Sequence, residues 1–346
     1  MIAAPHPHQR PVDARLLIVE AGGRLQSLPR TAFAGLVRPG DLIVANDAAT
    51  LPASLTGFHA PSGRAVEARL AGRGSLAPDD LAFQAVVFGE GDWRIRTEDR
   101  PLPPSLAAGD RLVLGPIEAW VEVVLGHPRL VRLRFEGRAE AIWAGIARHG
   151  RAVQYAHLAG PLNLWDVWTP VAGPPVAFEP PSAGFALDWA TLAAIRARGA
   201  GFATLTHAAG LSSTGDPELD ARLPFDEPYE IPASTAGAIA RTRASGGRVI
   251  AIGTTVVRAL EHAGGRAGAG MADQRLGPDS DLRVVDAILS GTHETDTSHY
   301  QLLRAFTDDA VLARADQLLA DEGYRTHEFG DSVLIERRPR AARVAA

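Results

Sequence analysis

The stretch "GGRVIAIGTTVVRALEHA", residues 246–263, decides the fold of this chain. Its apolar run at 249–252 ends at Gly253, and apolar residues then recur with helical spacing from Thr254 onward. A short run without polar residues is typical of a strand buried on both faces, and a helix that follows at once completes half of a strand–helix–strand unit. The stretch therefore predicts an α/β sheet with parallel strands.

The turn between this strand and this helix is also a candidate binding site. The first N–H groups of a helix have no partner within the helix, so Gly253, Thr254 and Thr255 could receive a carboxylate or a phosphate. Arg258 lies one turn further along and could bind the same anion with its guanidinium. The simpler alternative is a threonine-capped turn with Arg258 paired to Glu261. No G-x-G-x-x-G motif follows the strand, so a dinucleotide-binding fold is not indicated.

The same order of elements continues on both sides of this stretch. Residues 188–199 have the pattern of a helix whose first turn Asp188 caps, and residues 282–291 have the pattern of a strand. Residues 299–324 are expected to form one long helix. The glycine-rich segment 264–281 has no periodic pattern, so we expect a flexible loop there.

Residues 58–136 have a different texture from the rest of the chain. Short runs of alternating polar and apolar residues follow one another, and Gly or Pro separates most of them. Such runs are typical of antiparallel strands in a small barrel or sandwich. A helical pattern that ends at Gly150 comes next. The sequence thus predicts an α/β main domain, barrel-like in its alternation of strands and helices, at residues 1–57 and 139–346, with an all-β barrel inserted at 58–138.

The composition excludes several classes of chemistry. The 346 residues include no Cys, so disulfides, thiolate metal sites and a cysteine nucleophile are excluded. All 35 basic residues are Arg, which excludes a lysine Schiff base and a phosphate-loop lysine. The net charge of −5 does not indicate a nucleic-acid-binding protein. No apolar run is long enough to span a membrane, and the first residues lack a signal peptide's apolar region, so we expect a cytoplasmic protein.

The segment "GTHETDTSHY", residues 291–300, gathers possible metal ligands. Its histidines, His293 and His299, are six positions apart, whereas a metalloprotease helix carries them four apart on one face. The hydroxyl and carboxyl groups at 296–298 are explained more simply as a helix cap, so we predict no metal. His293 comes directly after a strand and is a candidate acid–base or ligand-binding residue.

Further polar candidates follow strands or open turns. Asn46 and Asp47 end an apolar strand, where side chains either cap a turn or line a site at the carboxyl ends of the strands. The turn "EPPSAGF" could place Ser182 and Gly184 in a cradle of backbone donors. His207 follows another strand, in the segment "THAAGLSSTGD". The chain contains no G-x-S-x-G motif, so a serine hydrolase of that type is not indicated.

The order of these segments resembles a known family. The segments that carry the likeness are "RPGDLIVANDAATLPASL", "EPPSAGF", "EPYEIPASTAGAI", "GGRVIAIGTTVVRALEHA", "LRVVDAILSGTH" and "DEGYRTHEFGDSVLI". Together they are similar to the S-adenosylmethionine:tRNA ribosyltransferase-isomerases of queuosine biosynthesis, from about Ala14 to Ile335. That family also inserts a β-barrel into an α/β domain. The chain departs from the family's pattern at Phe225, where the family usually has His, and at Asp296, where it commonly has Lys.

The resemblance implies an unusual reaction. The family transfers and isomerises the ribosyl moiety of S-adenosylmethionine onto an aminomethyl-deazaguanine base in the anticodon loop of tRNA, giving epoxyqueuosine with release of adenine and methionine. The sulfonium acidifies the ribose 5′ carbon, so a base can begin by removing a proton there. By this resemblance the candidate catalytic residues are Asp47, His293 and Glu227. The candidate substrate-binding residues are Asn46, Ser182, Gly184, His207, Gly253, Thr254, Thr255 and Arg258.

The resemblance also sets expectations about cofactors and partners. S-adenosylmethionine would be a co-substrate, with no tightly bound cofactor and no metal, and the tRNA anticodon loop would be the partner, with no membrane contact. Two alternatives stay open from the sequence: a divergent member that uses S-adenosylmethionine on a non-tRNA acceptor, and a non-catalytic binding protein of the same fold.

Overall fold

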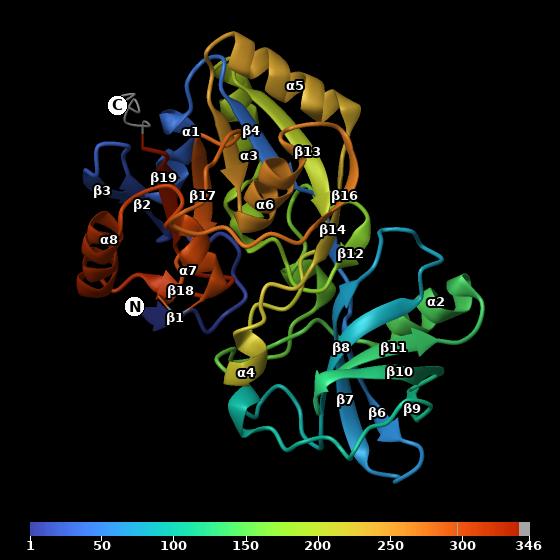
Figure 1. Ribbon diagram of the computed structural model, residues 1–346. Helices are drawn as coiled ribbons and strands as arrows, with labels where there is room; N and C mark the ends of the chain where they lie inside the picture. The colour runs from blue at the N-terminus through green and yellow to red at the C-terminus, as the bar shows by residue number, and fades with distance from the viewer. Residues whose placement is uncertain (296, 339–346) are drawn as a thin grey trace, which may run out of the picture.

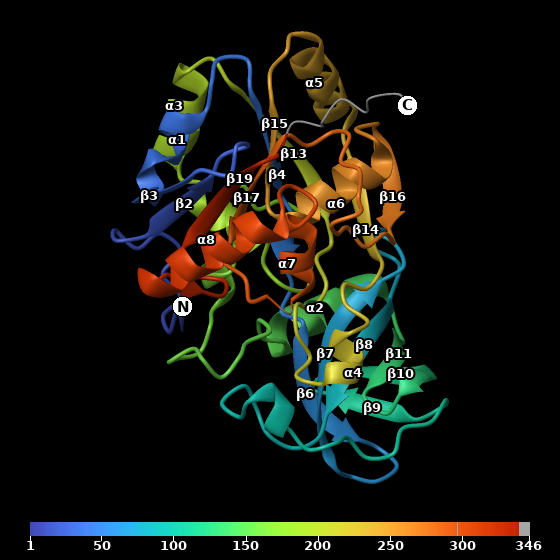
Figure 2. The same ribbon diagram turned by 60° about the vertical axis from the view of Figure 1, so that its left-hand side comes forward.

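The structure, a computed structural model, describes residues 1–295 and 297–338 (Figure 1). Asp296, which carried one of the sequence-based expectations, lies outside the described residues. The strands form a large mixed sheet at one end of the molecule and a closed barrel at the other (Figures 1 and 2). The predicted combination of an α/β region with an inserted all-β barrel is therefore confirmed.

The large sheet has nine strands. Their order across the sheet is β16 (Gly268–Ala272), β14 (Glu227–Ile231), β13 (Gly201–His207), β4 (Leu42–Asn46), β15 (Val249–Ile252), β17 (Ala287–Gly291), β19 (Ser332–Glu336), β2 (Arg15–Val19) and β3 (Leu25–Pro29). Strands β13, β4, β15 and β17 run parallel to one another. Antiparallel pairs occur toward both edges.

The centre of this sheet follows from its apolar runs. Every residue of β4 and β15 is buried, because helices cover both faces of the sheet there. The strand predicted at 249–252 is thus confirmed, and so is its parallel pairing.

Two details of the expected main domain are wrong. The sheet is open in the described residues, not barrel-like: its edge strands β16 and β3 each join by antiparallel pairing, so the regular parallel repeat that closes an α/β barrel is interrupted at both ends. The expected loop at 264–281 contains β16. Its small residues give no periodic pattern, yet their backbone pairs with β14 along the whole strand.

The described residues form eight helices. They are α1 (Phe33–Leu36), α2 (Ala139–His149), α3 (Trp189–Ala197), α4 (Pro217–Asp220), α5 (Ala233–Ala244), α6 (Thr254–Ala263), α7 (Ser298–Leu303) and α8 (Asp309–Asp321). Helices α5 to α8 pack on one face of the sheet, and α1 and α3 pack on the other. Short 3-10 turns are η1 (Arg30–Ala32), η2 (Thr97–Asp99), η3 (Leu164–Asp166) and η4 (Ser182–Ala186).

The helix starts illustrate both success and failure of sequence patterns. Asp188 caps α3 as expected, since its carboxylate accepts a hydrogen bond from Thr191 N at 2.6 Å. The cap of α7 is Thr297, whose hydroxyl accepts from Tyr300 N at 3.2 Å. The long helix expected at 299–324 is split into α7 and α8. The second helix starts after Asp308, because aspartate favours the position before a first turn over a helix interior.

The barrel consists of six antiparallel strands. They are β6 (Ser54–His59), β7 (Ala65–Arg73), β8 (Ala82–Phe88), β9 (Arg111–Leu114), β10 (Ile117–His127) and β11 (Leu130–Phe135), closed in the order β10-β11-β8-β7-β6-β9. Two short parallel sheets pair β1 (Ile2–Ala3) with β18 (Arg325–Thr326), and β5 (Ala49–Thr50) with β12 (Pro175–Ala177).

Helix α2 packs on the barrel. Its residues Ile142 and Ile146 belong to the barrel core, and Gly145 lies so close that an added Cβ would be 2.2 Å from Ile117 Cγ2. Gly150 ends the helix as predicted, and its backbone is extended, a conformation that any residue can adopt. Glycine is required there because the chain packs closely: an added Cβ would lie 2.2 Å from Pro52 O. Where the chain divides into domains stays a prediction, with the barrel strands spanning 54–135.

Candidate active site

The parallel strands of the large sheet end at one edge, and a pocket opens there. In α/β sheets this edge is where ligands bind, since chain connections leave a crevice outside the strand ends. The pocket encloses about 720 Å³ including its open mouth. We call it the strand-end pocket; it is lined by η4 and the residues before it, the loop after β13, the start of β14, the first turns of α6, the turn after β17, and α7.

The strand-end pocket brings together most of the residues predicted from the sequence. Those that line it are Ser182, Glu227, Gly253, Thr254, Thr255, Arg258 and His293. Those that do not are Asn46, Asp47, Gly184 and His207. Segments that lie far apart along the chain therefore converge at this edge of the sheet.

The start of α6 presents backbone to the strand-end pocket. Gly253 has a φ of 95°, which glycine adopts readily, and it supplies no side chain to cap the helix. An added Cβ would be in contact with Ala183 Cβ in η4 at 3.4 Å, and the positive φ would strain any other residue there. The N–H groups of the first turn, at Thr254 and Thr255, are free of helical partners and carry the positive end of the helix dipole. This turn can bind an anion.

Arg258 forms a buried ion pair with Glu227. Its Nη1 donates to Glu227 Oε2, and its Nη2 donates to Ala272 O at 2.7 Å, whereas its Nε has no hydrogen-bond partner among the described residues. Glu227 Oε1 also accepts from Gly210 N at 2.5 Å. Arg258 is therefore not paired with Glu261, whose carboxylate instead accepts three backbone N–H groups at 283–285.

His207 lies behind this pair. It is 0% exposed, and its Nε2 is 3.5 Å from Glu227 Oε2. Burial lowers the pKa of His207 well below its usual value, and the Arg258 guanidinium lowers it further, so the imidazole is neutral near pH 7. Burial raises the pKa of Glu227, while Arg258 opposes this rise.

Asn46, Asp47 and Gly184 support the pocket from outside. Asn46 Nδ2 donates to His207 O at 2.9 Å and to Thr255 Oγ1 at 3.3 Å, so it ties the end of β13 to the start of α6. Asp47 Oδ1 accepts from Thr206 Oγ1 at 2.7 Å, and Asp47 is not among the residues that line the pocket. At Gly184 an added Cβ would meet Thr169 Cγ2 at 2.9 Å. That Asp47 acts as a base stays a prediction, and its place outside the pocket lining does not support it.

His293 and His299 form a stacked pair at the pocket wall. Their ring centroids are 4.7 Å apart at an interplanar angle of 11°, and Ser290 Oγ contacts His293 Nε2 at 2.8 Å. Only His299 belongs to a helix, which is why a spacing of six brings the rings together. Burial lowers the pKa of His293 well below its usual value, and burial lowers that of His299 to about 4, with Arg258 adding to it. Both rings are neutral near pH 7.

Sequence reasoning missed one buried acid, Glu179. It is 7% exposed and lines the strand-end pocket directly after β12. Its Oε1 accepts from Tyr155 Oη and its Oε2 from Ser212 N at 2.9 Å. Burial raises the pKa of Glu179 to about 7, and the nearby carboxylate of Glu328 contributes. The signal in the sequence was a single carboxyl between an apolar run and a Pro-Pro turn, a place where burial is expected.

One group of side chains in the described residues has the composition of a metal site. His157, His327 and Glu328 place their ligand atoms within 4.8 Å of one another. The two imidazoles, however, are stacked at 4.2 Å with an interplanar angle of 16°. Nitrogen lone pairs lie in the ring planes, so those of parallel stacked rings do not converge on one ion. That the protein uses no metal stays a prediction.

Comparison with known proteins matches the chain to one family along nearly its whole length. The model of the family described as "Queuosine biosynthesis protein" matches residues 1–335. The chain belongs to this family. The S-adenosylmethionine:tRNA ribosyltransferase-isomerase of Azoarcus sp. (strain BH72) is 32% identical over 95% of this chain and 92% of its own length. That of Sorangium cellulosum (strain So ce56) is 33% identical over 97% and 95%.

A solved structure has the same fold as this member of the queuosine biosynthesis family. The crystal structure of the S-adenosylmethionine tRNA ribosyltransferase from Thermotoga maritima superposes with a TM-score of 0.51 at 20% sequence identity, covering 96% of each chain. None of the described helices is both long and apolar enough to cross a bilayer.

Proposed function

We propose that this protein transfers and isomerises the ribosyl moiety of S-adenosylmethionine onto the aminomethyl-deazaguanine base of a tRNA anticodon loop, giving epoxyqueuosine and releasing adenine and methionine. The observation that carries the proposal is the family match over residues 1–335, which includes both the sheet and the barrel. We propose further that the protein acts in the cytoplasm, with S-adenosylmethionine as a co-substrate and with no tightly bound cofactor.

The strand-end pocket is the proposed site for S-adenosylmethionine. The methionine carboxylate binds at the first turn of α6, where Thr254 and Thr255 offer backbone N–H groups at the positive end of the helix dipole. Arg258 adds the N–H of its Nε, which has no partner among the described residues. Glu227 holds the guanidinium in place through its own ion pair, so it is a positioning residue in this proposal.

His293 acts in the proposed site as a neutral imidazole. Its depressed pKa makes a charged form unfavourable near pH 7, so the ring serves as a hydrogen-bonding group for the nucleoside or as a transient proton carrier. Contact with Ser290 at Nε2 leaves Nδ1 for substrate. Asn46 and His207 contribute by fixing the strand ends behind the pocket, and Ser182 and Gly184 by shaping η4.

The decisive measurement is release of adenine from S-adenosylmethionine. Purified protein is incubated with S-adenosylmethionine and tRNA that carries the aminomethyl-deazaguanine base; adenine is followed by chromatography and the tRNA nucleosides by mass spectrometry. Adenine together with epoxyqueuosine is the expected result. Release without modified tRNA would indicate another acceptor, and binding of S-adenosylmethionine without release would indicate a non-catalytic protein.

A further inference from the structure

A second cavity opens beside the strand-end pocket. It encloses about 1140 Å³ including its open mouth and shares with the strand-end pocket the walls formed by Glu179, Ser212, His293 and His299. It extends from there toward β18 and α4. A ligand in the second cavity would therefore lie next to a ligand in the strand-end pocket.

The second cavity is acidic. The carboxyl groups that line it are Glu179, Asp220, Glu294 and Glu328, and no arginine is among the described residues of its lining. Its histidines do not offset these charges, because burial lowers the pKa of His293, His299 and His327. Carboxylates in a partly enclosed space attract a cation more strongly than in open water. The cavity suits a positively charged group.

Glu179 is buried and Glu328 is partly buried, and each has an acceptor oxygen with capacity for a further hydrogen bond. Each oxygen of Glu179 accepts one hydrogen bond, from Tyr155 Oη or Ser212 N, which leaves lone pairs on both. Glu328 Oε2 lies 3.4 Å from His157 Nε2 and has no hydrogen-bond donor among the described residues. A buried acceptor without a donor is costly unless a ligand satisfies it. An ammonium, with three donors, would do so.

We propose that the second cavity binds the acceptor base by its primary ammonium group, and that Glu179 is the base that removes a proton from that ammonium. The inference rests on the proposed function and names the acceptor site within it. In this step an N–H bond of the ammonium breaks and an O–H bond forms on Glu179. The uncharged amine that results has a lone pair free to bond with the ribosyl group in the strand-end pocket.

Glu179 is the only one of the four acids that lines both the second cavity and the strand-end pocket. Asp220 already accepts three hydrogen bonds, from Thr214 N at 2.6 Å, from Thr214 Oγ1 at 2.7 Å and from Ser213 Oγ at 3.2 Å. Glu294 is exposed. Glu328 pairs with His157 away from the strand-end pocket. It can hold the ammonium but does not reach the reacting sugar.

The raised pKa of Glu179 suits this role. A carboxylate that protonates near neutral pH accepts a proton from an ammonium more readily than an ordinary carboxylate does. Burial is the main cause, the charge of Glu328 raises the pKa further, and the hydrogen bonds from Tyr155 and Ser212 lower it. The other ionisable groups near this carboxyl are Asp220, His293 and His299 in the cavity walls, and Arg69, whose guanidinium lies 5.6 Å from the Tyr155 ring.

The test follows the pH dependence of kcat/KM for precursor-loaded tRNA, by adenine release. Because the base must be ionised, activity of the unchanged enzyme is expected to rise with pH through about 7. Tyr155→Phe removes a hydrogen bond that lowers the pKa of Glu179, so the rise should move to higher pH. Glu328→Gln removes a charge that raises it, so the rise should move to lower pH. Opposite shifts from two neighbouring substitutions would not result from a purely structural role.

Two further measurements complete the test. Glu179→Gln should lower kcat/KM about 100-fold or more while calorimetry still detects S-adenosylmethionine binding. Glu328→Gln should raise KM for tRNA and reduce the preference over an otherwise identical tRNA whose base lacks the amine. Glu140→Gln removes an exposed carboxylate on α2 and is the matched control.

Failure of the inference and failure of the proposed function give different results. If the unchanged enzyme is active but Glu179→Gln has the same rate and pH profile, or neither neighbouring substitution moves the profile, the assignment of Glu179 is overturned. If the unchanged enzyme releases no adenine with precursor-loaded tRNA, the proposed function itself is overturned. Should Glu179→Gln not fold, the opposite shifts of the other two variants decide the question.

Discussion

At Arg258 a buried guanidinium meets a buried carboxylate, and each group depends on the other. Arg258→Met leaves Glu227 without its cation, so we expect the free energy of unfolding to fall by roughly 3–5 kcal/mol. Arg258→Met combined with Glu227→Gln should lose less, because no unpaired charge stays buried. Urea unfolding of the single and double variants measures both values. A single variant as stable as the double one would show that the pair is not buried as described.

The same residues show what local sequence can reveal about a site. Gly253, Thr254 and Arg258 were predictable because a strand, a glycine and a helix start stand side by side in the chain. The partner of Arg258 was not, because Glu227 comes from β14 and only the sheet brings it near. Glu179 was missed for a related reason: its pKa is raised by burial and by the charge of Glu328, and both depend on segments that are distant in sequence.

At the scale of the element, the turn from β15 into α6 depends on one glycine. Gly253→Ala forces a side chain into positive φ and brings its Cβ to 3.4 Å from Ala183 Cβ in η4. We expect a loss of about 1–2 kcal/mol in unfolding free energy and weaker S-adenosylmethionine binding by calorimetry. Gly40→Ala is the matched control, since Gly40 also has positive φ but faces open space. It should lose similar stability with unchanged affinity; an equal loss of affinity would contradict the proposed role of α6.

Strands and helices with a clear apolar pattern in the sequence could be predicted, and those without one could not. Strands β4 and β15 were evident, since helices on both faces require apolar residues throughout. Strand β16 was not, because its Gly and Ala residues carry no alternation and its pairing partner is the backbone of β14. Likewise the apolar positions of α7 and α8 follow one helical pattern, and the break between them lies between Phe306, which is buried in the sheet core, and Asp308, which precedes the first turn of α8.

At the scale of the whole molecule, sheet and barrel have separate cores, and the second cavity reaches Asp220 and Leu223 in the segment that packs on the barrel. The core of the barrel also takes in Leu219 and Phe225 from the segment around α4, which starts from the large sheet's side of the molecule. Asp220 at the end of α4 lines the second cavity. The short alternating runs at 58–136 predicted the insertion, but which segment packs the barrel against the sheet could not be known before the fold.

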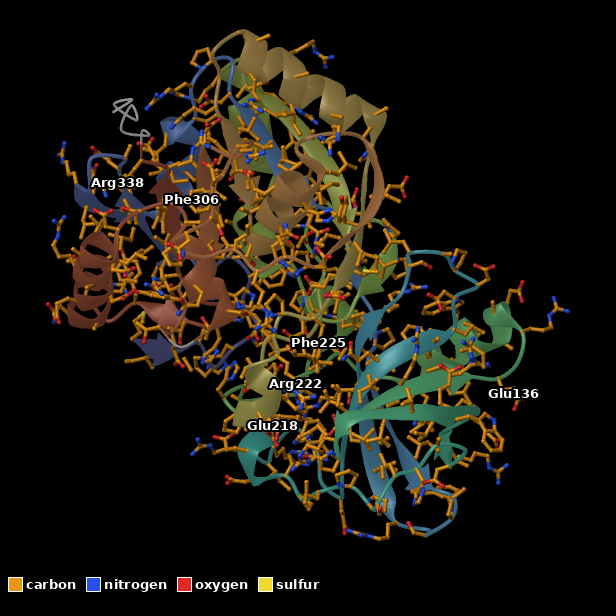
Figure 3. All side chains as sticks on the ribbon, viewed as in Figure 1. Glu136, Glu218, Arg222, Phe225, Phe306 and Arg338 are labelled. Atoms are coloured by element: carbon orange, nitrogen blue, oxygen red, sulfur yellow. The ribbon has the colours of Figure 1, made fainter. Side chains whose placement is uncertain are left out.

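Arg222 connects the segment around α4 to the barrel by hydrogen bonds. Figure 3 shows it beside α4, between the large sheet and the barrel. Its guanidinium donates to Leu125 O at 3.0 Å and to Gly126 O at 3.2 Å, both in β10. Arg222→Ala should cost only about 1–2 kcal/mol of stability, because two hydrogen bonds to β10 and an ion pair with the exposed Glu218 are lost at a partly exposed position. Its effect on the acceptor should be larger, since the wall that carries Asp220 is then held against the barrel mainly by apolar packing.

We therefore expect kcat/KM for precursor-loaded tRNA to fall about tenfold in Arg222→Ala, a factor that corresponds to about 1.4 kcal/mol, with S-adenosylmethionine affinity unchanged. Arg24→Ala removes an exposed arginine of the β2–β3 turn and serves as the control for net charge. Adenine release at several tRNA concentrations, with calorimetry for the donor, measures both effects. If Arg222→Ala weakened donor and acceptor equally, the junction would be shaping the strand-end pocket as well, and the separation of the two sites would be wrong.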